Sequence, residues 1–556
     1  MKVRTEQLNP TIGDLKGNAE LILDAINRAE ASGVDLLILP EMAVTGYPVQ
    51  DLLESEDFRE RCYQTNSKII SATAGTAVIF GSITPNNGYG RKMYNSAILA
   101  RNGEMLGITH KTLLPTYDIF DDLRYFEPNT VFRCLELEGT RLGVTICEDI
   151  WYNENEVQYH TYEIDPAQEM KKAGADVVIN ISASPFTAGK HENRVSMLRN
   201  HVKRLELPIF YSNQTGAHTD VIFDGDSMIL DKNGEITASV QPFQPGFADV
   251  QWDPAAGRIS PITDFKSLYP DRKEERQFEA IRCGLRDYIR KTGISDNVLI
   301  GLSGGIDSAL VCTIAAETLG ADKVTAITLP SRFSSEGSVT DSDKLAHNLG
   351  IRFEKISIEE VNKEFLKGLS PFFEGLPFGT AEENLQSRIR GTFLMAYSNK
   401  FNSFLLATGN KSEYAVGYAT LYGDMNGALS LIGDLYKTEV YDLCRWLNSH
   451  WFKKEVIPES IITKAPSAEL RPDQKDSDSL PEYDILDDIL YRYIDLQQSR
   501  EKIIKSGHDK DTVLKITRLA DLNEFKRFQS VPILKLSSKS FGSGRRWPIV
   551  QRWTYQ

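Results

Sequence analysis

A short stretch near the middle of the chain, Val298–Ser308, constrains the fold more than any other, because an apolar run leads there into two adjacent glycines. Its sequence is VLIGLSGGIDS, and an apolar segment with several alanines follows it. This order predicts a buried strand, a tight turn and the start of a helix. Glycines let the backbone approach a ligand closely, and the free N–H groups that begin a helix attract anions. The stretch therefore predicts an α/β domain with a phosphate-binding turn.

The details of this turn distinguish it from other phosphate loops. A Walker-type loop closes with Gly-Lys-Ser/Thr, which is absent from this turn. The order Ser-Gly-Gly-x-Asp-Ser instead resembles the loop of the ATP pyrophosphatases, which cleave ATP to AMP and pyrophosphate. Two adjacent glycines alone would fit a turn that binds nothing. The resemblance implies that one run of residues holds ATP: Gly301, Leu302, Ser303, Gly304, Gly305, Ile306, Asp307 and Ser308.

The length of the chain, 556 residues, predicts at least two large domains. Apolar residues make up 41% and charged residues 25%, as in globular proteins. The net charge of −14 argues against nucleic acid as the main partner. The sequence shows neither a signal-peptide core nor an apolar run long enough to span a bilayer, so we expect no membrane partner. Six scattered cysteines without a C-x-x-C pair fit a reducing compartment, and we expect a cytoplasmic protein.

In the first half, helical and strand patterns alternate. Residues 15–32 have apolar positions at helical spacing, and short runs rich in Val, Ile and Leu predict strands at 35–39, 77–83, 95–99, 141–146, 176–181, 208–211 and 226–230. Asn233-Gly234 predicts a hairpin turn. Pro254, Gly257, Pro261 and Pro270 make the following stretch irregular. We therefore expect a first domain over 1–255 and a linker over 256–273.

The second half predicts a parallel sheet over residues 274–556. A helix over 275–292 opens it, and strands and helices then alternate from 298 to 357. Residues 370–380, rich in Pro, Gly and Phe, and residues 464–483, polar with three prolines, are expected to be mobile.

Three reactive residue types in the first half each follow an apolar strand: Glu41, Lys111 and Cys147. A thiol becomes a strong nucleophile when a carboxylate takes its proton, and a lysine ammonium can stabilise the oxyanion that forms on an amide. Each residue alone has an ordinary structural explanation, as an acid at a helix start, a surface charge or a small buried side chain.

The order Glu-Lys-Cys with these flanks resembles the nitrilase/amidase superfamily over about residues 1–255. The resemblance implies a four-layered α-β-β-α sandwich, in which Glu41 is the general base, Lys111 the oxyanion stabiliser and Cys147 the nucleophile. The segments LPTYDIFDDLRYFEP and ISASPFTAGKHENR resemble the glutamine-using branch, which implies that Tyr117, Ser184 and Lys190 line a glutamine pocket. The chain departs from that pattern at Asp122, where related sequences favour glutamate.

Further motifs in the second half extend the resemblance. AEENLQSRIRG is expected on a helix, LLATGNKSEYAVGYATLYGDM begins as a strand, LYKTEVYDL begins a helix, and NEFKRFQSVPILKLSSKSFG lies near the C-terminus. Together with SGGIDS they resemble the glutamine-dependent NAD+ synthetases over nearly the whole chain. This implies a Rossmann-like, parallel-sheet ATP pyrophosphatase domain (adenine nucleotide alpha hydrolase-like) and the conversion of deamido-NAD+, ATP and L-glutamine to NAD+, AMP, pyrophosphate and glutamate.

The same resemblance implies ligands for individual residues. Thr408 would contact ATP, and Asn384, Glu413 and Lys526 would contact deamido-NAD+. The phosphates need a counter-ion, so Mg2+ is the expected cofactor, with Asp307 and Glu413 as its associated acids. The family also implies a homo-oligomer.

Three other functions are alternatives to this one. Another ammonia-using ATP-pyrophosphatase ligase, similar to GMP or asparagine synthetase, would share only SGGIDS with this chain. A tRNA-modifying thiolase would be expected to have a basic face and often cysteine pairs. A non-enzymatic ATP sensor would have no need for Glu41, Lys111, Cys147 and Asp307. Product analysis separates them, since the main hypothesis requires NAD+ and AMP.

Overall fold

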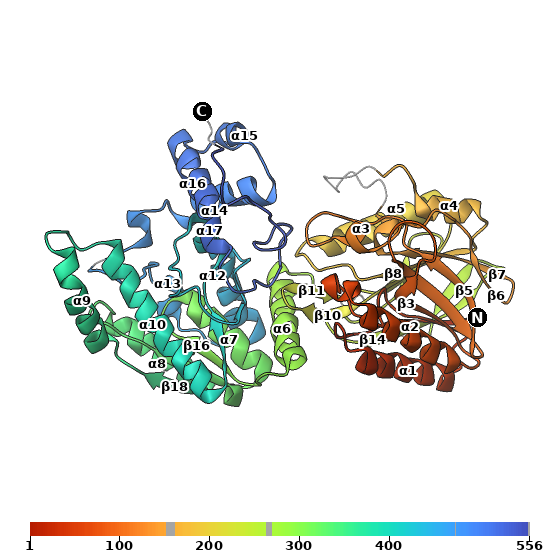
Figure 1. Ribbon diagram of the computed structural model, residues 1–556, viewed down its shortest axis with the longest axis horizontal. Coiled ribbons are helices and arrows are strands. Elements are labelled where there is room, and N and C mark those ends of the chain that lie inside the picture. The colour runs from red at the N-terminus through yellow and green to blue at the C-terminus, as the bar shows by residue number, and fades with distance from the viewer. Residues whose placement is uncertain (152–161, 263–268, 473, 554–556) are drawn as a thin grey trace. The chain divides into compact units, whose positions relative to one another are not determined.

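The computed structural model describes residues 1–151, 162–262, 269–472 and 474–553 (Figure 1). The chain divides into two compact units, Met1–Lys273 and Glu274–Gln556. Each unit has its own sheets and apolar cores, as independent domains do. No helix in the described ranges is long and apolar enough to cross a membrane.

Two sheets face each other in the first unit, and their inner faces share one apolar core. Ile38 and Ile79 of one sheet meet Val144 and Ile179 of the other in this core. The seven-stranded sheet has the order β15-β14-β1-β2-β3-β4-β5 and the six-stranded sheet the order β13-β12-β9-β8-β7-β6. The strands are β1 (Lys2–Gln7), β2 (Leu36–Ile38), β3 (Ala77–Pro85), β4 (Met93–Arg101), β5 (Glu104–His110), β6 (Leu135–Leu137), β7 (Thr140–Ile146), β8 (Val177–Ser182), β9 (Ile209–Asn213), β10 (Thr215–His218), β11 (Val221–Asp224), β12 (Met228–Leu230), β13 (Ile236–Ser239), β14 (Gly246–Asp253) and β15 (Arg258–Pro261).

Helices cover the outer faces of both sheets. Buried residues of the first two helices join a core with the outer face of the seven-stranded sheet, and α4 and α5 do the same on the six-stranded sheet. The α-β-β-α sandwich is thereby confirmed, and so is the hairpin at Asn233-Gly234, which joins β12 to β13. The helices are α1 (Leu15–Ala31), α2 (Glu56–Ser71), α3 (Asp122–Tyr125), α4 (Pro166–Lys172) and α5 (Lys190–Leu205).

The end of the first unit differs from the expected linker over 256–273. Strand β15 pairs antiparallel with β14, with Trp252 opposite Ile259, so the sheet continues beyond residue 255. The cause of the difference is that Pro254 and Gly257 form the turn of this hairpin, where Gly257 donates to the Pro254 carbonyl at 3.3 Å. Ile259 is 9% exposed and joins the core between the sheets. Residues 263–268, within the expected linker, lie outside the described residues.

The second unit contains one five-stranded sheet, and all its strand pairs are parallel, as predicted. Its order is β18-β17-β16-β19-β20, so the strand that leads into the glycine turn, β16, lies in the middle. Ile389 on α10 packs against Leu299 and Leu405 of two adjacent strands. The strands are β16 (Val298–Gly301), β17 (Val324–Thr328), β18 (Arg352–Lys355), β19 (Phe404–Ala407) and β20 (Leu429–Ser430).

Helices of this unit follow the sheet strands and then form a C-terminal group with its own core. They are α6 (Lys273–Thr292), α7 (Ile306–Leu319), α8 (Glu336–Leu349), α9 (Glu359–Phe373), α10 (Thr380–Phe401), α11 (Lys411–Val416), α12 (Lys437–Trp446), α13 (Glu459–Thr463), α14 (Tyr483–Leu490), α15 (Arg500–Lys505), α16 (Lys510–Leu522) and α17 (Glu524–Arg527). Part of the segment expected to be mobile at 370–380 is helical, because α9 continues through Pro371 to Phe373.

Candidate active sites

Cys147 lies at the point where β7 ends and a short helical turn begins. Its backbone has φ +46°, in the left-handed region that residues other than glycine rarely adopt. Asp149 fixes this turn, because its carboxylate accepts from the Ile146 amide at 3.0 Å and from the Leu113 amide at 2.8 Å. This turn, called the nucleophile turn below after the role expected of Cys147, is thus bonded directly to the chain that follows Lys111, and its strained backbone is held in place by these bonds.

Glu41 and Lys111 form a buried ion pair beside this turn. The Lys111 ammonium donates to Glu41 Oε1 at 2.9 Å, and the two side chains are 1% and 0% exposed. Asn95 Nδ2 donates to the same oxygen at 2.6 Å, and the Ala183 amide donates to Glu41 Oε2 at 2.7 Å. Together, the two oxygens of this carboxylate therefore accept hydrogen bonds from three donors, which belong to three separate parts of the chain.

The thiol of Cys147 is close to both charges. Burial raises the pKa of the Cys147 thiol well above its usual value, and the Glu41 charge raises it further, whereas Lys111 and a hydrogen bond from the Ala183 amide lower it. The Ala183 amide, which lowers the pKa of the thiol, is the same group that donates to the Glu41 carboxylate at 2.7 Å. A thiol with a raised pKa stays protonated at rest and needs a base to become a nucleophile, and Glu41 is the carboxylate placed for that transfer.

Asp122 is the second counter-ion of Lys111. Its Oδ2 accepts from the Lys111 ammonium at 2.7 Å, and its Oδ1 accepts from the Tyr47 hydroxyl at 2.8 Å. Although burial alone lowers the pKa of Lys111, the charges of Asp122 and Glu41 raise it well above its usual value. The shorter acid at this position therefore makes a direct ion pair, and Lys111 stays charged.

The three residues expected in a glutamine pocket surround the same turn. The Tyr117 hydroxyl donates to Glu148 at 2.9 Å, and Glu148 directly follows the nucleophile. Ser184 is buried, and its amide donates to Asn213 Oδ1 at 2.8 Å. Lys190 begins α5, 5.3 Å from the Trp151 ring, and burial lowers its pKa to about 8. The charges of Cys147 and Glu148 both raise that pKa.

The glycine turn of the second unit has the geometry of an anion site. Gly304 has φ +78°, and a Cβ there would lie 2.3 Å from the Ser338 carbonyl oxygen, so only glycine fits. The Ser308 hydroxyl meets the Ser303 amide at 3.2 Å and closes the turn. Helix α7 begins after Gly305 without a side-chain cap, so its first N–H groups are available to a ligand.

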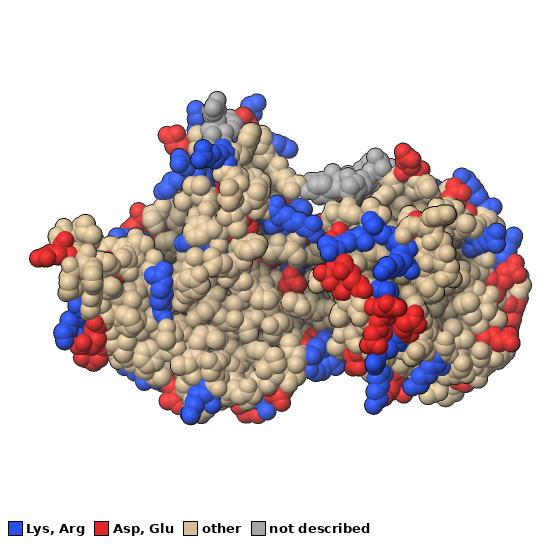
Figure 2. All heavy atoms as spheres, in the orientation of Figure 1, with Lys and Arg blue, Asp and Glu red and all other residues tan. Residues whose placement is uncertain are grey.

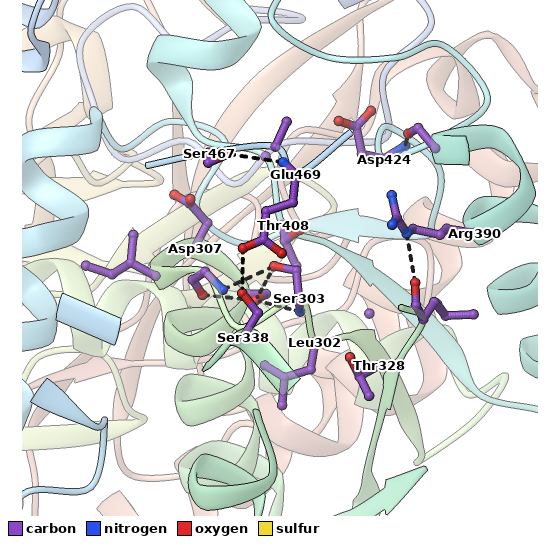
Figure 3. A pocket seen from close by; sticks show the side chains of 18 of the residues that line it. Leu302, Ser303, Asp307, Thr328, Ser338, Arg390, Thr408, Asp424, Ser467 and Glu469 are labelled. Carbon is purple, nitrogen blue, oxygen red and sulfur yellow. Dashed lines mark hydrogen bonds between the residues drawn. The ribbon is translucent and has the colours of Figure 1, made fainter. Parts of the chain in front are cut away.

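This turn forms one wall of a cavity of about 280 Å³ (Figure 3). Arg390 and Thr328 lie on one side of it, and Ser467 and Glu469 lie on another. The residues expected to hold ATP or a metal that line it are Gly301, Leu302, Ser303, Gly305, Ile306, Asp307, Ser308, Thr408 and Glu413. Its volume approaches the range typical of sites for small organic ligands.

Lys437 lies between the two acids that were expected to associate with Mg2+. Its ammonium contacts Asp307 Oδ2 at 2.5 Å and Glu413 Oε1 at 3.3 Å. Burial raises the pKa of Glu413 to about 8, although the Lys437 charge lowers it. The described residues contain no group of three acids, histidines or cysteines that could hold a metal alone. Two carboxylates that converge on one point fit Mg2+, which typically binds one or two protein carboxylates together with substrate phosphates.

Asn384 and Lys526 are not among the described residues that line this cavity. Asn384 Oδ1 accepts from the Thr420 hydroxyl at 2.8 Å, and the Lys526 ammonium donates to the Gly417 carbonyl at 2.6 Å. Both residues therefore hold the loop that follows α11, and Tyr418 and Asp424 of that loop do line the cavity.

A cluster at the start of α8 was not expected from the sequence. Glu469 accepts from the Ser335 hydroxyl at 2.9 Å, from the Ser338 hydroxyl at 2.8 Å and from the Lys464 ammonium at 2.7 Å. The segment that was expected to be mobile, 464–483, is thus bonded over the cavity at its first residues. Residue 473 of this segment lies outside the described residues.

Several other residues of these sites were also missed: Asn95, Glu148, Lys437 and Arg390. Glu148 was open to detection, because an acid beside the presumed nucleophile in CEDIW is a ready partner for an ammonium group. Lys437 lies within the quoted motif LYKTEVYDL, but nothing in that motif shows that it meets Asp307, which is 130 residues away.

On the visible surface, basic and acidic side chains are interspersed (Figure 2).

Comparisons with known proteins match the two units to two different families. The carbon-nitrogen hydrolase family matches residues 2–258, and the NAD synthase family matches residues 277–530. A glutamine-dependent NAD(+) synthetase from Synechocystis sp. is 44% identical to this chain, and the match covers 98% of this chain and 98% of the relative. One from Acinetobacter baylyi is 40% identical, and the match covers 99% of this chain and 98% of the relative. A solved structure of such a synthetase from Acinetobacter baumannii, in complex with adenosine diphosphate, is 36% identical, has a TM-score of 0.78, and covers 100% of this chain and 99% of its own.

Proposed function

This chain belongs to the glutamine-dependent NAD+ synthetases, and on that premise we propose which of its residues carry out each half of the reaction. It is an enzyme that forms NAD+ with ATP and with ammonia taken from glutamine. The alternatives that share only SGGIDS do not explain relatives that match both units. We propose deamido-NAD+ as the acceptor and assign glutamine hydrolysis to the first unit and ATP use to the second.

The observation that carries the first assignment is that Glu41 and Lys111 form a buried ion pair 2.9 Å long, and the charges of both act on the Cys147 thiol. We infer that Glu41 takes the thiol proton while the sulfur attacks the side-chain amide carbon of glutamine. The oxyanion that forms faces the Lys111 ammonium, which the Asp122 charge keeps protonated. The oxyanion then collapses to a thioester, Glu41 returns the proton to the leaving nitrogen, and ammonia departs. Water hydrolyses the thioester to glutamate and restores the thiol.

The pocket residues offer complementary charges to the rest of glutamine. Glu148, held by the hydroxyls of Tyr117 and Tyr162, is the proposed partner of the α-ammonium group. Lys190 is the proposed partner of the α-carboxylate, and Ser184, which follows the Ala183 amide bound to Glu41, is proposed as a further contact of glutamine. Burial raises the pKa of Glu148, so a bound ammonium group would stabilise its ionised form.

In the second unit we propose that the Ser303–Ser308 turn holds the ATP phosphates, with Thr408 beside it just after the adjacent strand β19. The nicotinate carboxylate would attack the α-phosphorus, pyrophosphate would leave, and ammonia would then displace AMP from the acyl-adenylate. Asp307, Glu413 and Lys437 are placed to orient the charged groups. We propose that Asn384 and Lys526 act on deamido-NAD+ through the loop that they hold.

Mg2+ is proposed as the counter-ion of the phosphates, with Asp307 and Glu413 as its protein ligands. When bound, it would neutralise phosphate charge during the transfer. A cytoplasmic location is proposed because all six cysteines are free thiols, as a reducing compartment maintains them. A homo-oligomer is proposed as well, and sedimentation velocity of the full chain tests it, since a single monomeric species would contradict it.

Product analysis of the full chain and two variants tests the assignment. With ATP, Mg2+, glutamine and deamido-NAD+, the wild type should release NAD+, AMP, pyrophosphate and glutamate. Cys147→Ala should lose synthesis from glutamine and keep synthesis from ammonia, because no thioester can form. Asp307→Ala should lose synthesis from both nitrogen sources and keep glutamate release. ADP as the product would refute the phosphate chemistry, and loss of ammonia-dependent synthesis in Cys147→Ala would refute the division between the units.

A further inference from the structure

Tyr269 is a buried aromatic residue in the last part of the first unit, four residues before α6 begins. It is 8% exposed, so this part of the chain packs into the unit at that point instead of lying on its surface. Its ring stacks on the His191 ring at 3.8 Å between centroids and 10° between planes, and it lies 6.4 Å from the Phe243 ring. His191 directly follows Lys190 on the first turn of α5.

The hydroxyl of Tyr269 joins a buried network of charges beneath the same helix. It donates to Asp224 Oδ2 at 3.0 Å. Arg194, one turn further along α5, donates to Asp224 at 3.0 and 3.1 Å and to Asp226 at 2.6 Å. His191 Nδ1 lies 2.8 Å from Asp226. The Arg194 and Asp224 side chains are both 0% exposed, so water cannot replace a partner that is lost.

This network is adjacent to the proposed glutamine pocket. Lys190 responds to the charges of Arg194 and Asp224 as well as to those of Cys147 and Glu148. Lys190 begins the helix that carries His191 and Arg194, and its ammonium lies 5.3 Å from the ring of Trp151, four residues after Cys147. The direction of the first turn of α5 fixes where that ammonium is, and both contacts of Tyr269 act on one side of this helix, because His191 and Arg194 are three residues apart. The ring stacks on His191, and the hydroxyl bonds to Asp224, the partner of Arg194.

We propose that Tyr269 is a positioning residue of the glutamine pocket, because it holds the first turn of α5 and thereby the Lys190 ammonium. The segment that leads to α6 is then a structural part of the glutaminase unit. The inference rests on the proposed role of Lys190 in binding glutamine. Because Tyr269 would act through Lys190, its loss would lower the affinity for glutamine and leave the attack of the thiol unchanged.

Kinetics of glutamate release by the full chain test this separation. Tyr269→Ala removes both contacts and should raise KM for glutamine about tenfold, with kcat changed less than about twofold. Tyr269→Phe keeps the stacked ring and loses only the hydrogen bond to Asp224, so its KM should rise by about threefold. Ammonia-dependent NAD+ synthesis should stay at the wild-type rate in both variants. If Tyr269→Ala does not fold, Tyr269→Phe decides the question.

Alkylation of Cys147 supplies a readout that general damage to the unit would not reproduce. Inactivation by 6-diazo-5-oxo-L-norleucine, which has the α-amino acid group of glutamine, should slow in the Tyr269 variants. Inactivation by iodoacetamide, which lacks that group, should proceed at the wild-type rate. Tyr89→Ala is the matched control, because Tyr89 is a fully exposed tyrosine of the same unit.

Lys190→Met separates failure of this inference from failure of the proposed function. If Lys190→Met leaves the KM for glutamine unchanged, the proposed glutamine pocket is wrong and the inference falls with it. If Lys190→Met raises KM but both Tyr269 variants bind glutamine like the wild type, only the inference is overturned. Equal slowing of both alkylation reactions would also overturn it, because it would show damage to the nucleophile turn.

Discussion

Replacement of Asp122 by asparagine tests how Lys111 is held for catalysis. The amide keeps the size of the side chain and can still bond to the Tyr47 hydroxyl, but it has no charge to pair with Lys111. The Lys111–Asp122 pair is 2.7 Å long, with side chains 1% and 5% exposed. Breaking a pair this deeply buried costs ~3–5 kcal/mol. Since Lys111 keeps Glu41 at 2.9 Å, we expect the lower end of that range.

A loss of about 3 kcal/mol in the transition state corresponds to a rate lower by about a hundredfold. In the proposed mechanism the oxyanion would face Lys111, and removal of a single oxyanion donor elsewhere costs ~10²–10³ in rate, which is a loss of the same size. We therefore expect Asp122→Asn to release glutamate about a hundredfold more slowly than the wild type. Ammonia-dependent NAD+ synthesis, measured on the same preparation, should not change.

Asp122→Glu is the matched variant, because it keeps the charge and adds one methylene. We expect it to retain glutamate release to within about tenfold of the wild type, since the carboxylate can still pair with Lys111. The reasoning would be refuted if Asp122→Asn released glutamate at close to the wild-type rate. It would also be refuted if the asparagine and glutamate variants lost the same activity, since the charge would then be irrelevant.

Three further outcomes follow from the two sites. In Gly304→Ala the new Cβ would lie 2.3 Å from the Ser338 oxygen, at a backbone φ of +78°, so the turn should be distorted. This variant should lose ATP-dependent synthesis and keep glutamate release. An unchanged KM for ATP would contradict the need for glycine at this position. Burial lowers the pKa of Lys190 to about 8, so its ammonium is lost as the pH rises through that value, and KM for glutamine should increase between about pH 7 and 8.5, before the α-ammonium group of glutamine itself loses its proton; Lys190→Arg should remove this increase. Hydrogen exchange of residues 464–483 should slow when ATP and deamido-NAD+ bind, because we expect this segment to close over the cavity as a lid. The slowing should be larger in Glu469→Gln, since the segment is less protected there before the ligands bind. Equal exchange with and without the ligands would exclude a lid.

Much of the fold followed from local sequence patterns. The strand VLIG, the two glycines and the helix after them appear where predicted, because strand and helix periods and glycine turns depend on neighbouring residues. The nucleophile turn and the buried Glu41–Lys111 pair agree with the order Glu-Lys-Cys. One difference, β15, arose because Pro254 and Gly257 fit a hairpin turn as well as a linker, and another is α9, which continues into the segment that was expected to be mobile.

Contacts between distant residues were out of reach of such patterns. The Ala183 amide is a backbone group, so its residue type gives no sign that it meets Glu41, 142 residues away. Lys437 looks like an ordinary lysine at a helix start until the fold brings it to Asp307. The family resemblance implies that Asn384 and Lys526 contact deamido-NAD+, which stays a prediction, but nothing in the sequence shows the hydrogen bonds by which they hold the loop beside the cavity. Side-chain partners of this kind depend on packing, which sequence spacing does not encode.

Strand β15 also determines where this protein can be divided. A polypeptide ending at residue 255 would lack the outermost strand of the seven-stranded sheet and would leave the outer side of β14 without its partner. Uncovered strand edges of that kind pair with other chains and promote aggregation. The same truncation would remove Ile259 from the interior and Tyr269 from its place on α5. An isolated hydrolase half should therefore be expressed through residue 273, because β15 covers the edge of β14 and Tyr269 packs on α5.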